Sequence, residues 1–178
     1  HSDFTPKGPY HTYHGYDIPD YGIKRLDSSQ YYLQQNPAYI YPKSQDFVFG
    51  YTVLEGSNRI NHVPFVDKMS PNFGISQIFV KNKIQNIDTF VDFTRYQMEI
   101  SKSKYTLILP AYDEKCFSIF RFLEAIHRDC LPLIHPGCHV KDVEQSFGVS
   151  LSPLIRDTPF SSSERDELLS EYKGKMLK

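Results

Sequence analysis

Arg121 and Glu124 stand three residues apart in the segment 117–128, whose apolar residues recur at helical spacing. Residues three apart on a helix share a face, so the two side chains can act together. An arginine binds phosphate oxygens, and a carboxylate can accept hydrogen bonds from the two neighbouring hydroxyls of a ribose. The pair therefore suits a nucleoside diphosphate. The same spacing is also typical of a solvated surface ion pair, which contributes only about a few tenths of a kcal/mol.

The start of the same helix adds to this chemistry. Ser118 can cap the helix, and the free N–H groups of a first helical turn attract an anion. Arg121 would place a full positive charge beside these groups. A diphosphate would satisfy both the N–H groups and the arginine.

Short apolar strands and helices alternate around this segment. The sequence predicts strands at residues 46–50, 77–80, 90–93, 105–109, 130–134 and 152–155, and helices at residues 30–35, 96–102, 117–128, 140–147 and 163–176. A further helix that starts after residue 54 is expected to be interrupted at Pro64. Alternation of this kind predicts an α/β fold, a Rossmann-like three-layer domain with a mostly parallel sheet. Ligands of such sheets bind at the carboxyl ends of the strands, which favours the loop before Ser118.

Residues 1–42 differ in composition from the rest of the chain. They hold eight of the 13 tyrosines and show little apolar periodicity. The sequence therefore predicts an extended arm or interdomain linker at 1–42 and a Rossmann-like domain at 43–178. Because the chain starts with His1, we expect a piece of a longer protein, with a partner domain upstream.

Residues 103–134 resemble the donor-site segment of GT-B glycosyltransferases, including exostosin-like enzymes. In that family a strand, a loop, a helix with an R-x-x-E motif and a second strand follow one another, as they do here around Arg121 and Glu124. The resemblance implies that the chain is half of a GT-B architecture. It assigns the phosphate contact, and with it catalysis, to Arg121 and the ribose contact to Glu124.

Three blocks of the chain also resemble the bacteriophage DNA β-glucosyltransferases, over residues 44–140. They are residues 46–52 followed by Gly56 and Arg59, residues 93–96, and residues 117–124. The phosphate loop of those enzymes is richer in glycine and arginine than residues 51–55 are here. The resemblance implies UDP-glucose as donor and hydroxymethylated DNA bases as acceptor, with DNA held by the partner domain.

The resemblance also assigns donor contacts to further residues. Glycine at position 50 would let the backbone approach a phosphate closely, although a glycine can also simply end a strand. A loop at 93–96 would hold the base edge, mostly through backbone groups, and the loop before the helix would hold the sugar hydroxyls unless it is an ordinary turn. The implied donor-binding residues are Gly50, Thr52, Arg59, Thr94, Arg95, Tyr112, Asp113 and Ser118.

The implied reaction is transfer of a hexose to an acceptor hydroxyl through an oxocarbenium-like transition state. Arg121 and the helix N-terminus would stabilise the charge that builds on the leaving diphosphate. The general base is expected on the partner domain, so the chain should bind the donor but transfer sugar poorly by itself. No tightly bound cofactor is expected. A Mg²⁺ ion could help to neutralise the diphosphate, but no acidic cluster requires one.

Composition and residue spacing narrow the classes of protein to which the chain could belong. With 20 basic and 21 acidic residues, the net charge of −1 does not suit a self-sufficient nucleic-acid binder. Three cysteines without a CxxC pair favour reduced thiols in a cytoplasmic protein, in the host cytoplasm if a phage encodes it. The segment 135–139 has metal-ligand residue types but lacks a second pair, so no metal site is expected. No apolar run reaches the roughly 18 residues that a membrane span requires.

Two other classes of protein fit the same sequence. One is a non-catalytic nucleotide-binding or assembly module, which could carry the Arg121–Glu124 pair without an acceptor domain. The other is a sheet-based interaction protein that binds its partner through the tyrosine-rich arm. That second class would have no affinity for nucleotides.

Overall fold

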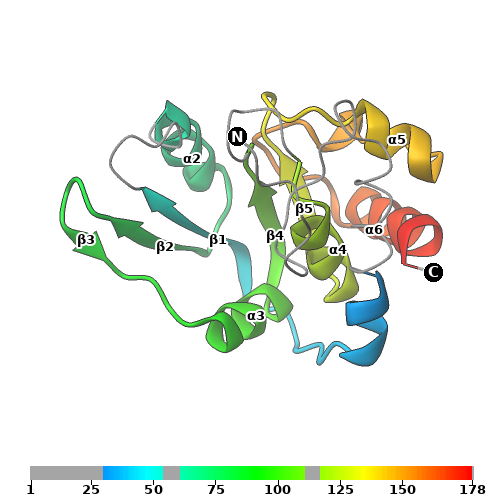
Figure 1. Ribbon diagram of the computed structural model, residues 1–178, viewed down its shortest axis with the longest axis horizontal. Helices are drawn as coiled ribbons and strands as arrows, with labels where there is room; N and C mark the ends of the chain where they lie inside the picture. The colour runs from blue at the N-terminus through cyan, green and yellow to red at the C-terminus, as the bar shows by residue number, and fades with distance from the viewer. Residues whose placement is uncertain (1–29, 54–60, 111–116, 178) are drawn as a thin grey trace, which may run out of the picture.

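The computed structural model describes residues 30–53, 61–110 and 117–177 of the chain. They form an α/β domain around a five-stranded sheet with the strand order β3-β2-β1-β4-β5 (Figure 1). All neighbouring strands run parallel except β3, which pairs antiparallel with β2 at the edge. The strands are β1 (Gln45–Val53), β2 (Ser76–Asn82), β3 (Ile87–Asp88), β4 (Ser103–Ile108) and β5 (Leu131–Ile134).

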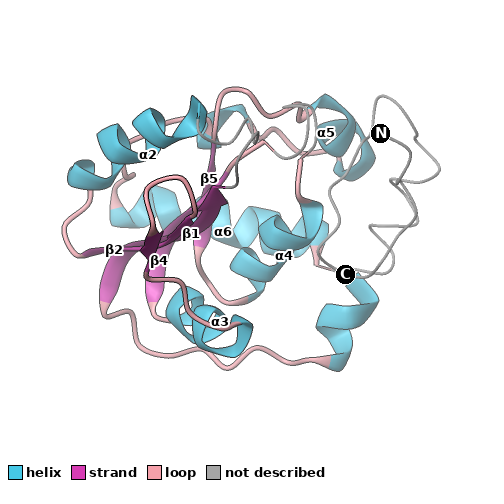
Figure 2. Ribbon diagram, turned by 60° about the vertical axis from the view of Figure 1, so that its left-hand side comes forward, coloured by secondary structure: helices cyan, strands magenta, loops and turns pink. Residues whose placement is uncertain are grey.

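Helices connect the parallel strands and cover both faces of the sheet. Figures 1 and 2 both place α2 on one side of the sheet and α3 on the other. The predicted Rossmann-like three-layer fold is therefore confirmed. The helices are α2 (Val63–Met69), α3 (Phe93–Ser101), α4 (Ile119–His127), α5 (Lys141–Phe147) and α6 (Ser162–Met176), with single 3₁₀ turns η2 (Ser70–Asn72) and η3 (Ser152–Leu154).

Alternation along β1 decides which of its side chains can reach each face. Phe47 stacks on Phe73, which follows α2 and η2, with ring centroids 4.9 Å apart. Val48 points the other way and packs with Ile100 of α3. Residues at 50 and 52 therefore lie on the same side of the sheet as α3.

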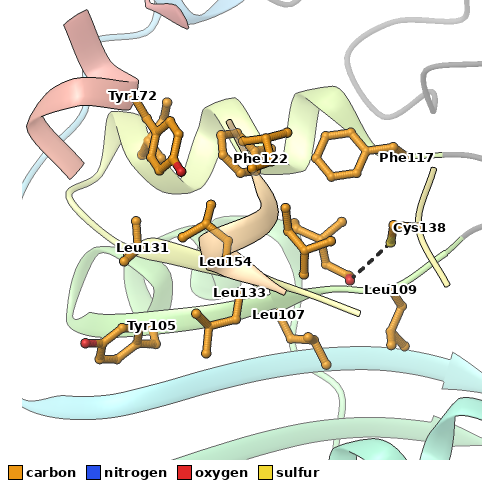
Figure 3. Packing of buried hydrophobic residues seen from close by; sticks show 14 of the residues in the cluster. Tyr105, Leu107, Leu109, Phe117, Phe122, Leu131, Leu133, Cys138, Leu154 and Tyr172 are labelled. Atoms are coloured by element: carbon orange, nitrogen blue, oxygen red, sulfur yellow. Dashed lines mark hydrogen bonds between the residues drawn. The ribbon is translucent and has the colours of Figure 1, made fainter. Parts of the chain in front are cut away.

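Helix α4 is apolar almost all round and lies inside the domain. Phe122 contacts Tyr172 of α6 edge-on, with ring centroids 6.0 Å apart, and Phe117 packs on Phe122 from just before the helix (Figure 3). Arg121 is the single exposed residue of α4. A helix buried on nearly all sides fixes whatever its one polar face presents.

The helical segment 30–35 packs on the same core. Leu33 is 2% exposed, and Tyr32 contacts Phe120 of α4 edge-on at 5.5 Å between centroids. The side chain of Gln30 donates to the carbonyl of Met176 at 2.9 Å. This part of the tyrosine-rich segment is therefore docked on α4 and α6, whereas the domain boundary at residue 42 stays a prediction.

Three predicted elements differ from the structure, and one observed strand was not predicted. No strand forms at 90–93, because the Asp92 side chain accepts the N–H of Arg95 at 2.8 Å and caps α3, which begins at Phe93. Strand β3 at 87–88 was not predicted. Residues 152–155 contain the turn η3 in place of a strand, since Pro153 suits a helical first turn. Pro64 does not interrupt α2 but stands in its first turn, where a missing N–H costs nothing.

Asp129 joins the turn after α4 to α6 and is left-handed, with φ 56°. Its carbonyl accepts from Arg165 at 2.6 Å, and its carboxylate pairs with Lys173. Asparagine tolerates the left-handed region but carries no charge. We expect Asp129→Asn to lower the free energy of unfolding by up to about 1 kcal/mol, and Asp129→Ala by roughly 1–2 kcal/mol more.

Urea denaturation of the two variants measures this difference. Glu171→Ala, which removes an exposed ion pair with Lys175, serves as the control and should change stability little. Equal stability of the alanine and asparagine variants would show that the backbone strain contributes nothing.

Candidate functional site

The connection order places a topological switch point between β1 and β4. The chain leaves β1 towards β2 and later returns past β1 to β4. In open α/β sheets, ligands bind at the carboxyl ends of the strands at such a point. Helix α4 runs from the carboxyl end of β4 back to the amino end of β5, so its N-terminus lies at this edge (Figure 1). We call Thr52, Ser118, Arg121 and Glu124, which β1 and α4 bring to this region, the switch-point site.

Arg121 occupies the first turn of α4, as the sequence predicts. Its side chain is exposed, whereas the residues on both sides of it in the helix are fully buried. The guanidinium therefore adds a positive charge to the positive end of the helix dipole at the carboxyl edge of the sheet.

Ser118 is the N-cap residue of α4, but its side chain does not cap the helix. The residue is 6% exposed, and within the described part of the chain its hydroxyl has no hydrogen-bond partner. Leaving a buried hydroxyl unpaired costs roughly 1–3 kcal/mol. An unpaired buried hydroxyl three residues before Arg121 makes this helix start a candidate site for a ligand with hydrogen-bonding oxygens.

Glu124 lies one turn from Arg121 on α4, as the spacing predicts, but it is buried. It is 2% exposed, whereas Arg121 is exposed. Its carboxylate accepts a hydrogen bond from Gln97 of α3 at 2.9 Å and lies 4.0 Å from the guanidinium of Arg128. The ribose contact of Glu124 stays a prediction, and it would have to be made from a buried position beside Gln97.

Burial raises the pKa of Glu124 above its ordinary value of 4.5, although Gln97, Arg128 and Arg121 counteract this. Because the folded-state pKa is raised, folding favours the protonated form of Glu124. The stability that the protonated form contributes is full below pH 4.5 and is lost as the pH rises through the folded-state pKa. In Glu124→Gln the side chain has no proton to lose, so this pH dependence disappears. We expect the stability of the wild type relative to this variant to fall as the pH rises from 4 to 7.

Thermal unfolding of both proteins across that range tests the sign of this dependence. A difference that stays constant with pH would mean that Glu124 keeps its ordinary pKa. Glu167→Gln, an exposed change on α6, provides the background pH dependence.

The structure gives a packing reason for glycine at position 50, while the approach of a phosphate stays a prediction. A Cβ atom at this position would lie 3.0 Å from Cε1 of Tyr96 and 3.3 Å from Phe90. The N–H of Gly50 donates to the Tyr96 hydroxyl at 3.0 Å. The backbone of Gly50 is therefore closely approached by an aromatic ring of the protein itself.

The segment 93–96 is not a loop, contrary to the prediction, because it forms the first turn of α3. The N–H of Arg95 is bonded to the Asp92 side chain and that of Tyr96 to the Asp92 carbonyl. Neither group is available to a base edge. Thr94 and the Arg95 side chain are exposed, and the latter pairs with Glu99 at 3.2 Å.

Three predicted donor contacts, Arg59, Tyr112 and Asp113, lie outside the described residues. Thr52 lies near the carboxyl end of β1, on the α3 side of the sheet. Of the predicted contacts, the structure thus brings Thr52, Ser118 and Arg121 to one edge.

The sequence analysis included Tyr96 only in a base-edge loop and missed Gln97. Their contacts with Gly50 and Glu124 join positions far apart in the chain. The signal that could have found them is Asp92, an N-cap residue followed by Tyr96 and Ile100 at helical spacing.

The structure gives less support to a nucleophilic cysteine or a metal site. Burial raises the pKa of both the Cys130 and Cys138 thiols to about 12, so neither is a nucleophile at neutral pH. Cys138 lies with its sulfur 3.6 Å from the Ile108 carbonyl (Figure 3). In the segment 135–139, Nδ1 of His135 accepts the N–H of Gly137 at 2.9 Å. Among the described residues, no three His, Cys, Asp or Glu side chains are grouped to hold a metal ion.

A hollow of about 180 Å³ lies at the amino edge of the sheet, opposite to the switch-point site. Its charged groups already have partners. Lys104 pairs with Asp46 at 3.4 Å, and Arg165 donates to the Lys104 carbonyl at 3.1 Å. No described helix is long and apolar enough to cross a membrane.

The fold and this edge define the chain as a Rossmann-like α/β domain with a candidate anion site at the start of α4. No known protein family matches the chain, and no curated protein is significantly similar to it in sequence. The function is therefore argued from the site itself.

Proposed function

We propose that the chain binds a nucleoside diphosphate sugar at the switch-point site and serves as the donor domain of a glycosyltransferase. The observation that carries the proposal is the buried hydroxyl of Ser118 at the N-terminus of α4, which has no partner among the residues that the structure describes. The exposed Arg121 one turn further on supplies the positive charge that a diphosphate requires. UDP-glucose is the donor that the sequence resemblance implies.

The geometry supports electrostatic catalysis. In hexosyl transfer the bond to the sugar breaks early, and negative charge develops on the leaving diphosphate. In this proposal the first-turn N–H groups of α4 and the Arg121 guanidinium stabilise that charge from positions that are fixed before the reaction begins. A Mg²⁺ ion enters this proposal only as a ligand of the diphosphate.

The acceptor side of the reaction belongs to a partner domain in this proposal. The described residues provide no general base at the switch-point site, because Glu124 is held by Gln97 and Arg128. Hydroxymethylated DNA bases, the acceptor that the resemblance implies, would be bound by that domain. The near-neutral charge of this chain agrees with such a division.

Ser118→Ala tests the proposal, because stability and affinity should respond in different ways. The variant loses a buried hydroxyl that has no described partner, so its thermal stability should equal or exceed that of the wild type. Affinity for UDP should fall by about tenfold if the hydroxyl donates to a charged phosphate oxygen.

Titration calorimetry with UDP measures the affinity, and Ser150→Ala, an exposed serine after α5, is the control. If Ser118→Ala binds UDP as tightly as the wild type, the diphosphate does not lie at the start of α4.

A further inference from the structure

Strands β1 and β4 separate at the switch point. Their pairing comprises Gln45 with Ser103 and Phe47 with Tyr105, although both strands continue beyond these residues. The outer pairings continue to the ends of the strands, since β1 stays paired with β2 to Val53 and β4 with β5 to Ile108. A fork therefore opens between β1 and β4 towards their carboxyl ends.

The Tyr96 hydroxyl lies in this fork. It accepts the N–H of Gly50 from β1 at 3.0 Å, and the Thr106 side chain of β4 lies close enough to the same hydroxyl to lower its pKa. Tyr96 comes from α3 and is 6% exposed. One phenol thus lies against both strands where their own backbone pairing has ended.

We propose that Tyr96 is a positioning residue that holds β1 and β4 at a fixed separation, so that the carboxyl end of the fork admits the diphosphate beside Ser118 and Arg121. This inference rests on the proposed function. The phenol would contact the strands and not the ligand. Tyr96 would thereby set how far the end of β1 lies from the start of α4.

The surroundings of the hydroxyl support this role. Burial raises the pKa of Tyr96 to about 12, so the phenol keeps its proton and can donate one hydrogen bond while it accepts another. The charges of Arg121 and Glu124 act on the same hydroxyl in opposite senses. The fork and the switch-point site are therefore close neighbours. A Cβ atom at Gly50 would lie 3.0 Å from Cε1 of Tyr96, so the Tyr96 ring packs closely against β1.

Tyr96→Phe removes the connecting oxygen and keeps the ring. Tyr172→Phe is a matched control, because the buried Tyr172 of α6 also loses one hydrogen bond, to the Ser150 carbonyl at 2.7 Å. Both variants should lose stability, but only Tyr96→Phe should bind UDP at least fivefold more weakly. Thr106→Val, which removes the other strand contact, should weaken UDP binding as well, and the double variant should be little weaker than Tyr96→Phe alone.

Calorimetry with UDP on folded protein distinguishes the outcomes. If the wild type binds UDP and Tyr96→Phe binds it equally well, the positioning role is wrong while the proposed function stands. If Tyr96→Phe does not fold, Thr106→Val decides in the same way. If the wild type does not bind UDP, both the proposed function and this inference are overturned.

Discussion

Arg121→Ala is expected to weaken the binding of UDP by about 10- to 150-fold, which corresponds to the loss of one or two charged hydrogen bonds to phosphate. The arginine is the single exposed residue of α4. Its truncation should therefore change the free energy of unfolding by no more than about 0.5 kcal/mol. A large effect on affinity with a small effect on stability is characteristic of a ligand contact.

Two further variants sharpen this test, again by calorimetry with UDP. Arg121→Lys keeps the charge but loses the planar fork of donors, so its affinity should lie between those of the wild type and the alanine variant. Arg156→Ala changes a half-buried arginine that stacks on Phe160, outside α4, and should bind UDP normally. Equal losses in Arg121→Ala and Arg156→Ala would indicate a general effect of net charge and no specific site.

Gly50→Ala is expected to lower the free energy of unfolding by about 1–3 kcal/mol, because the added methyl group collides with Tyr96 at 3.0 Å. For a chain of this size that loss lowers the melting temperature by roughly 2–4 °C per kcal/mol. The Tyr96 ring is buried against β1, so it cannot move away freely. Differential scanning calorimetry measures the shift.

Gly174→Ala is the matched control for this prediction. Gly174 lies in α6, and an added Cβ meets nothing within 4 Å. Alanine there should raise stability by roughly 0.5–1 kcal/mol, through its better helix propensity. In a Tyr96→Leu background, Gly50→Ala should lower the free energy of unfolding by less, because the ring that the methyl group meets is gone. An unchanged cost in that background would place the strain somewhere other than the Tyr96 ring.

The unit from β4 through α4 to β5 could be predicted from sequence because its signals are local. Residues 105–109 and 131–134 are apolar and short, Pro110 ends the first strand, and helical spacing is unbroken from 119 to 127. The start of α4 at the carboxyl edge then follows from the parallel order of the strands. This reasoning placed Arg121 and Ser118 where the structure has them.

The surroundings of Glu124 could not be predicted in the same way. Its burial depends on α3, whose Gln97 is 27 positions away in the chain. The helical spacing of Arg121 and Glu124 shows that they lie near one another, but it does not show which of them a neighbouring helix covers. The largely apolar segment 90–93 predicted a strand where α3 begins. The contact between Gln97 and Glu124 therefore could not be predicted.

Gly50 shows a second limit of sequence reasoning. A glycine near the end of a first strand is compatible with a phosphate, a strand end or a packed ring. The choice depends on Tyr96, which is 46 positions away. The sequence shows that position 50 has no side chain. It does not show which residue packs into the space left free, because that depends on the tertiary structure.

A crystal structure of the chain grown with UDP would test the central claim most directly. We expect the diphosphate within hydrogen-bonding distance of the Ser118 hydroxyl and the Arg121 guanidinium, at the N-terminus of α4. UDP bound at the amino-edge hollow between Asp46 and Arg165, or a diphosphate that contacts neither Ser118 nor Arg121, would contradict it.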